Sequence, residues 1–257
     1  MNGINPLGTS TARPSQANNQ SAASQSGVAT PAKDAALIDT QVSRTEVSLL
    51  SRLLGGVATQ AAVRDANTDR DGLAAIAESA LDKIFGDNFW NNRDAHDAEV
   101  PNSEDPQRLA LAKQATDYGN NKGGNPFTGL SRDQLALITY DESGTFTVNE
   151  RRAAWEESYR QHEEWSRAMV AKIMDEYNRT HKTSSESHQE VLDYYKSLPA
   201  IEEAQLPKGY DMQLQALIQA ADSNEPSQHK KELESLLEVL NKRLESNKQA
   251  YVYFKNI

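Results

Sequence analysis

Cysteine is absent from this sequence of 257 residues. Its absence excludes a disulfide framework, a thiolate nucleophile, and zinc or iron–sulfur sites with cysteine ligands. The 13 glycines and 9 prolines are few for an all-β chain, which needs many tight turns. No apolar run approaches the roughly 18 residues of a membrane-spanning helix, so we expect no transmembrane segment.

Positive charge is also scarce in this chain. Lysine and arginine together number 27 against 37 aspartates and glutamates, which gives a formal net charge of −10. Proteins that bind nucleic acid usually present a basic surface, because they must neutralise phosphates. The acidic balance therefore predicts that nucleic acid is not a partner.

Acidic residues are missing from the first 33 positions, which hold five serines, three glutamines, four asparagines and six alanines. The only large apolar side chains there are Met1, Ile4, Leu7 and Val28. Such a segment cannot bury enough apolar surface to offset the entropy of ordering it. We therefore expect residues 1–42 to form a disordered leader. It lacks the apolar core of a Sec signal peptide.

The leader resembles the export signals of bacterial type III secreted proteins, which are disordered, rich in serine and glutamine, and free of acids at their start. The residues that carry this resemblance are Ile4, Ser10, Ser15, Gln16, Gln20, Ser21, Ser24 and Gln25. The resemblance implies secretion by a route independent of a signal peptide. The alternative is an ordinary disordered tail on a protein of the bacterial cytoplasm, because compositional signals are unspecific.

Helical periodicity dominates from about residue 43 onward, with apolar residues recurring at spacings of three and four. The longest helix is expected over residues 148–178. The predicted fold class is all-α: an irregular helical bundle with a long central helix, in one domain over residues 43–257. Pro199 and Pro207 bound a linker, so a subdivision near 199–208 is an alternative.

Helix starts are marked by capping residues. Asp105 precedes Pro106, and the pairs Ser131 with Gln134 and Thr147 with Glu150 have the spacing of capping boxes. Residues 87–105 are expected to form a polar loop. The single alternating stretch, Thr145–Val148, is expected to form at most a two-residue β-bridge.

A leucine stripe near the C-terminus comprises Leu233, Leu237, Leu240 and Leu244. It is too short for the three to four heptads that indicate a coiled coil. Packing of this helix against the body is the preferred interpretation. A homo-oligomer formed through the C-terminal helix is the alternative.

The segment Thr139–Glu150 looks like the calcium-binding loop of an EF-hand. Asp141 and Ser143 fall at positions three and five, Gly144 at the sharp turn, and Thr145 at position seven, which offers its carbonyl. Glu150 falls at position twelve, the bidentate ligand. The departure is Thr139 at position one, where a carboxylate is expected.

A second segment with the same spacing runs from Asn67 to Glu78. Its ligands would be Asn67, Asp69, Asp71 and Glu78, with Gly72 at the turn. Calcium is thus the one cofactor that the sequence indicates. The alternative for both segments is a turn followed by a helix cap. The loops lie 72 residues apart, which does not suit an ordinary EF-hand pair.

Residues 125–154 are similar to a segment of an uncharacterised pseudomonad protein family, and the resemblance extends over about residues 70–200. It implies a bacterial source and supplies no activity.

Other candidate groups are weaker. The oxygen-rich segment around His96 is expected to be a solvated acidic loop, and His162, Trp155 and Trp165 are expected in the core. No Gly-x-Ser-x-Gly, His-Glu-x-x-His or Walker motif occurs. The sequence therefore favours a secreted, effector-like virulence protein that binds a protein partner over an enzyme. The alternative is a calcium-binding, EF-hand-like regulatory protein.

Overall fold

The computed structural model describes residues 32–221, 230–231 and 233–240, with side chains from residue 49 onward. The chain divides into two compact units, Met1–Val42 and Ser43–Ile257. All regular secondary structure in the described residues is α-helical, which confirms the predicted fold class. The bounds are α1 (Ala32–Asn67), α2 (Arg70–Phe85), α3 (Asp87–Asn91), α4 (Arg93–Asp97), α5 (Pro106–Gly119), α6 (Arg132–Thr139), α7 (Val148–Thr180), α8 (Ser185–Lys196), α9 (Ala200–Glu203) and α10 (Tyr210–Ala220).

Helix α1 corrects two expectations. It begins at Ala32, inside the segment expected to be disordered, and at 36 residues it is longer than α7. The sequence from 32 to 54 contains neither glycine nor proline, so nothing in it interrupts a helix. The helix also continues through Gly55 and Gly56, because the flanking Leu54 and Val57 are buried and their packing outweighs the low helix propensity of glycine. Residues 1–31 of the predicted leader lie outside the described residues.

Two further corrections concern loops. Residues 87–105 contain the short helices α3 and α4 where a polar loop was expected, since Phe89 is buried and anchors this segment. The expected β-bridge at Thr145–Val148 is wrong, because Thr145 and Phe146 lie in a bend and Val148 already belongs to α7. The linker between Pro199 and Pro207 contains the single turn α9.

The predicted caps of three helices are confirmed. The Asp105 carboxylate accepts a hydrogen bond from the Gln107 amide at the start of α5. Ser131 opens α6 and Thr147 opens α7, each in a complete capping box. These caps satisfy amide groups that have no acceptor inside their own helix.

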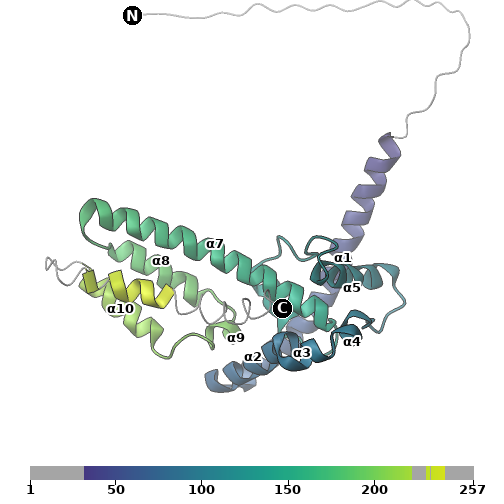
Figure 1. Ribbon diagram of the computed structural model, residues 1–257, viewed down its shortest axis with the longest axis horizontal. Helices are drawn as coiled ribbons and strands as arrows, with labels where there is room; N and C mark the ends of the chain where they lie inside the picture. Colours follow the sequence, from purple (N-terminus) through teal and green to yellow (C-terminus); the bar gives the residue numbers. More distant parts are fainter. Residues whose placement is uncertain (1–31, 222–229, 232, 241–257) are drawn as a thin grey trace, which may run out of the picture. The chain divides into compact units, whose positions relative to one another are not determined.

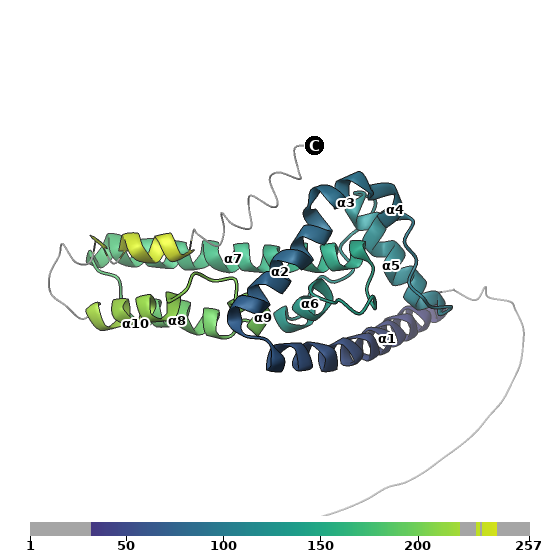
Figure 2. The same ribbon diagram turned by 90° about the horizontal axis from the view of Figure 1, so that it is seen from below.

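Helix α7 contributes to three hydrophobic clusters of the second unit, the smallest of which joins its Trp155 and Tyr159 to Ile84 and Phe85 of α2. Its first half supplies Ala153 and Ala154 to the α5–α6 core, which also contains Leu54, Val57, Ala115, Phe127, Leu135, Ile138 and Phe146. Its second half supplies Met169 and Ile173 to the α8–α10 core, which also contains Val191, Leu192, Tyr195, Leu198, Leu206, Tyr210, Leu214, Leu233, Leu236, Val239 and Leu240. Figure 1 shows α8 and α10 beside one end of α7 and α5 beside the other, and Figure 2 shows α6 at that second end as well.

The leucine stripe packs against the body, as preferred. Leu233 and Leu240 are buried in the α8–α10 core, and Leu237 packs against it. Leu244 lies outside the described residues. None of the described helices combines the length and the apolar character needed to cross a membrane.

Candidate functional site

The loop between α6 and α7 folds around the carboxylate of Asp141. Its Oδ1 accepts hydrogen bonds from the Ser143 amide at 2.9 Å and from the Ser143 hydroxyl at 2.5 Å. Its Oδ2 accepts one from the Phe146 amide at 3.0 Å. Gly144 makes the turn with φ of 79°, a conformation that favours glycine. The structure thus brings together the predicted ligands Asp141, Ser143 and Thr145, whose hydroxyl lies 2.8 Å from that of Ser143.

Glu150, the predicted bidentate ligand, is fully buried and already holds a cation. Arg108 from α5 binds its two oxygens at 2.6 and 2.8 Å. The amide and hydroxyl of Thr147 donate to the same carboxylate at 2.8 and 2.9 Å. Arg108 also donates to the carbonyl oxygen of Thr145 at 2.6 Å. The oxygens expected at positions seven and twelve of a calcium loop therefore bind one guanidinium group.

A second buried arginine lies at the other end of this loop. Arg151 Nε donates to the carbonyl of Thr139 at 3.1 Å. Burial lowers the pKa of Arg151, and the negative charges of Asp141 and Glu142 oppose that effect. Two positive side chains thus contact the loop, in a protein whose net charge is negative.

The segment Asn67–Glu78 does not form a twelve-residue loop. Helix α2 begins at Arg70, with Asp69 as its N-cap accepting from the Gly72 amide at 2.8 Å. Glu78 therefore lies about 12 Å along the helix axis from Arg70. Asn67 donates to the carbonyl of Val63 in α1. The structure does not bring Glu78 together with Asp69.

Among the described residues, no group of three or more histidine, aspartate or glutamate side chains is arranged to hold a metal ion. The calcium assignment stays a prediction for both segments.

A pocket of about 520 Å³ lies where the start of α2 meets the segment between α9 and α10. This volume falls within the usual range of 300–1,000 Å³ for ligand sites. Arg70 joins the two walls by donating to the carbonyl oxygens of Glu203 at 3.2 Å and Leu206 at 2.6 Å. The lining consists of three cations, four carboxylates, and three further residues: Arg70, Lys196 and Lys208; Asp69, Asp71, Glu203 and Asp211; Gly209, Tyr210 and Met212.

Asp69 and Asp71, two of the calcium ligands predicted in the segment Asn67–Glu78, line this pocket. Asp71 pairs with Lys208 at 2.8 Å, and the hydrogen bond from Lys208 lowers the pKa of Asp71. Burial, with a contribution from Glu203, raises the pKa of Tyr210 to about 12, so this phenol stays protonated at neutral pH. Met212 at the rim is 68 % exposed. The pocket offers a ligand both positive and negative side chains and one exposed apolar side chain.

A buried polar network lies between α6, α7, α8 and α9. Arg132 binds the Glu202 carboxylate at 2.5 Å and also donates to the Tyr194 hydroxyl. Burial alone would lower the pKa of Arg132, but the charge of Glu202, its hydrogen bond and the nearby Tyr194 and Tyr140 together outweigh burial, so the pKa is raised. The Tyr194 hydroxyl lies 2.9 Å from His162 Nδ1. His162 is fully buried, which confirms its expected place in the core.

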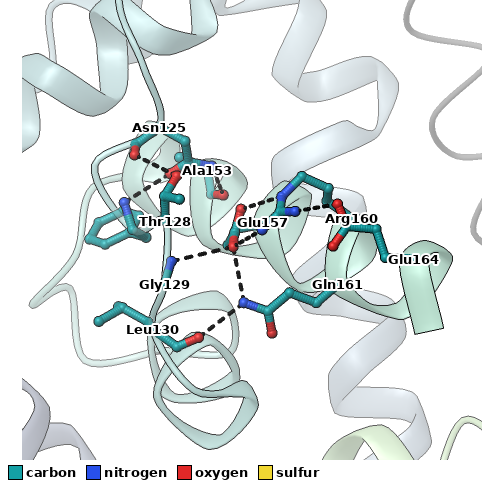
Figure 3. Close-up of polar contacts among 10 residues, drawn as sticks. Asn125, Thr128, Gly129, Leu130, Ala153, Glu157, Arg160, Gln161 and Glu164 are labelled. Atoms are coloured by element: carbon teal, nitrogen blue, oxygen red, sulfur yellow. Dashed lines mark hydrogen bonds and ion pairs between the residues drawn. The ribbon is translucent and has the colours of Figure 1, made fainter.

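Glu157 forms a further polar node on α7 (Figure 3). Its carboxylate accepts hydrogen bonds from Arg160 at 2.6 and 2.9 Å, from Gln161 at 2.9 Å, and from the Gly129 amide at 3.5 Å. Gln161 in turn donates to the carbonyl of Leu130 at 3.0 Å. Figure 3 shows that these hydrogen bonds connect α7 to the loop that precedes α6.

The expected acidic loop around His96 also contributes to the fold. Asn149 at the start of α7 donates to the carbonyl of His96 at 3.1 Å and to the Asp97 carboxylate at 3.0 Å. Glu99 accepts a hydrogen bond from the Val148 amide at 2.9 Å. Two of these acids therefore bind groups of α7 rather than only solvent.

Sequence reasoning missed the two buried arginines, although the sequence does contain a signal for them. Arg108 is followed at spacings of four and three by the buried Ala112 and Ala115. Arg151 precedes the buried Trp155 by four. A charged residue on the apolar stripe of a helix indicates a buried charge partner.

Comparison with protein-family models, with curated proteins and with solved structures found no match to this chain.

Proposed function

We propose that this protein is a bacterial effector-like protein, secreted without a cleavable signal peptide, that acts by binding a protein partner. The observation that carries the export part is the composition of residues 1–33, which contain no acid and a net charge of +2, whereas the remaining chain has a net charge of −12. A segment of this composition has few apolar side chains to bury, which suits passage through a narrow export channel.

The pocket at α2 and α10 supports the binding part of the proposal. The side chains of its Lys208–Asp71 pair are 74 % and 68 % exposed. Exposed ion pairs contribute little to folding, so a partner can exchange them for its own charges at small cost. Lys196 is exposed at the same pocket, and Met212 offers an apolar contact.

Export is tested by fusing residues 1–40 to a translocation reporter in a strain with an active type III system. The reporter should appear outside the bacterium, and it should be retained in an isogenic strain that cannot assemble the channel. A matched leader with Ser15→Asp, Ser21→Asp and Ser24→Asp adds three acids at constant length and should be exported poorly. Retention of the unmodified leader in the competent strain would contradict the proposal.

Partner binding at the pocket is tested by site-specific photo-crosslinking in host cells. A crosslinking residue at position 212 should give one discrete adduct. The control position is Val100, which is 69 % exposed and does not line the pocket. Lys208→Glu should abolish the adduct at 212. Equal adducts at both positions, or an adduct that persists in Lys208→Glu, would contradict a role for this pocket.

The alternative proposal, calcium-responsive regulation, is based on the spacing of the two EF-hand-like segments. It is tested by calorimetric titration of the full chain with Ca²⁺, with Mg²⁺ as the control. Saturable micromolar binding that Glu78→Gln or Glu150→Gln abolishes would favour it.

A further inference from the structure

We infer that the loop over residues 139–150 is an EF-hand-like loop whose cation is supplied by the protein itself, with the guanidinium of Arg108 in the place of a metal ion. This inference goes beyond the proposed export and partner binding and does not depend on them. It assigns the loop a fixed conformation that does not respond to calcium.

The oxygens that Arg108 binds are those that an EF-hand offers to its ion. In such a loop the carbonyl at position seven and both oxygens of the glutamate at position twelve are ligands. Here the corresponding oxygens are those of Thr145 and Glu150, and Arg108 contacts all three within 2.8 Å. A planar guanidinium suits this set, because its donors match a carboxylate in bidentate fashion.

Charge balance supports the same assignment. The loop carries the carboxylates of Asp141, Glu142 and Glu150, as an ion-binding loop does. Arg108 pairs with Glu150, Lys83 pairs with Glu142, and Arg151 lies at the Thr139 end of the loop, so cations of the protein itself balance these charges. Arg108 itself is 3 % exposed and also lies over the ring of Phe146, 5.7 Å from its centre. A metal ion could reach these oxygens only by displacing a buried ion pair.

The residue at position one of the loop also fits an arginine in the place of a metal ion. Thr139 is 1 % exposed, and its hydroxyl has no hydrogen-bond partner among the described residues. A carboxylate there would add a further negative charge beside Asp141, which an arginine clamp does not need. Threonine keeps an oxygen at this position without the charge.

The inference is tested by native-state hydrogen exchange on the full chain. The reporters are the amides of Ser143, Phe146 and Thr147, whose acceptors are Asp141 and Glu150. In the wild type their exchange rates should be the same in excess Ca²⁺ and in a chelator. In Arg108→Met these exchange rates should rise at least about tenfold, because the variant loses the hydrogen bonds from Arg108 that hold Glu150 and the Thr145 carbonyl in place. A single hydrogen bond to a charged group contributes about that factor or more.

Three further variants complete the experiment. Arg167→Met removes an arginine of an exposed ion pair on α7 and should leave these amides unchanged. Millimolar Ca²⁺ should slow exchange again in Arg108→Met, because the vacated oxygens regain a cation, but not in the double variant with Glu150→Gln. If Arg108→Met does not fold, Arg108→Lys replaces it in the measurement of amide protection alone, because it keeps the charge and loses the bidentate contact.

Three results would overturn the inference. The first is a change in the wild-type rates on adding Ca²⁺. The second is loop amides that stay protected in the folded Arg108 variant. The third is exchange in Arg108→Met that Ca²⁺ does not slow.

Discussion

At the scale of single residues, charged side chains occupy positions that a helical core usually gives to apolar ones. Arg108, Arg151, Glu150, Glu157 and Glu202 are all at least nine-tenths buried. Arg108 and the three glutamates are held in ion pairs, whereas Arg151 donates to the carbonyl oxygen of Thr139. Buried pairs of this kind contribute little net stability as pairs, but loss of one partner is costly because it strands the other charge.

Arg132→Met should therefore lower the free energy of unfolding by about 3 kcal/mol, since it leaves the Glu202 carboxylate buried without its cation. Urea denaturation at neutral pH measures the loss. Arg132→Met combined with Glu202→Met should recover a large part of it. Arg167→Met, at an exposed pair, should change stability by less than about 0.5 kcal/mol. A double variant as unstable as the single one would contradict this account.

Acid should weaken the fold at Glu157. Burial alone would raise the pKa of this carboxyl, but hydrogen bonds from Arg160, Gln161 and the Gly129 amide hold it below its ordinary value of 4.5. A group whose pKa is lower in the folded state adds stability above its ordinary pKa, and that stability is lost as the pH falls through the folded value.

The measurement for Glu157 compares urea midpoints of the wild type and Glu157→Gln between pH 7 and pH 3. The difference in stability should narrow as the pH falls below about 4.5, where the unfolded chain takes up the proton first, and it should vanish below the lower pKa of the folded state. Asp175→Asn, at a carboxylate that is 68 % exposed and pairs with Arg179, serves as the control. Parallel profiles for the wild type and Glu157→Gln would show that this node does not titrate as inferred.

At the scale of elements, local chemistry and tertiary packing decide different features. The starts of α5, α6 and α7 follow from their caps. The course of α1 through Gly55 and Gly56 does not, because the two glycines disfavour a helix and only the packing of Leu54 and Val57 retains it. The short α3 likewise depends on the burial of Phe89.

Removal of the cap of α6 should cost about 1 kcal/mol in Ser131→Ala, the usual loss when a serine N-cap becomes alanine. Thr147→Ala should cost more, because its hydroxyl also donates to the buried Glu150 carboxylate. Thermal unfolding of the two variants and the wild type measures which variant loses more stability. Equal losses would mean that the Thr147 hydroxyl acts only as a cap.

At the scale of the whole molecule, the two largest hydrophobic cores of the unit Ser43–Ile257 share α7. A helix that supplies buried side chains to both cores couples their stabilities, since neither core can open fully without exposing part of it. The C-terminal leucines complete one of these cores, so residues 233–240 are engaged within the chain.

We therefore expect one cooperative unfolding transition. Leu236→Ala in the α8–α10 core and Leu135→Ala in the α5–α6 core should each lower the free energy of unfolding by about 2–5 kcal/mol. Each variant should therefore unfold in one transition at a lower urea concentration than the wild type. Both leucines are fully buried, which makes the variants a matched pair. Far-ultraviolet circular dichroism and tryptophan fluorescence should give the same midpoint in each variant. Two separated transitions would show that the cores unfold independently.

The sequence by itself determined the helical class, the start of three helices and the buried stripe on α7. These features depend on residues at most four apart, which a periodic pattern records directly. The turn at Gly144 and the acids around it could also be predicted, because one loop contains all of them.

Only the tertiary structure decided what those acids bind and where a ligand can enter. Arg108 meets Glu150 across 42 residues, and Arg132 meets Glu202 across 70. The pocket joins residues 69–71 to residues 196–212. The loop spacing that indicates calcium is the same whether a metal ion or an arginine lies at its centre. The position of a guanidinium from another helix depends on how the helices pack, and no local pattern in the sequence encodes that packing.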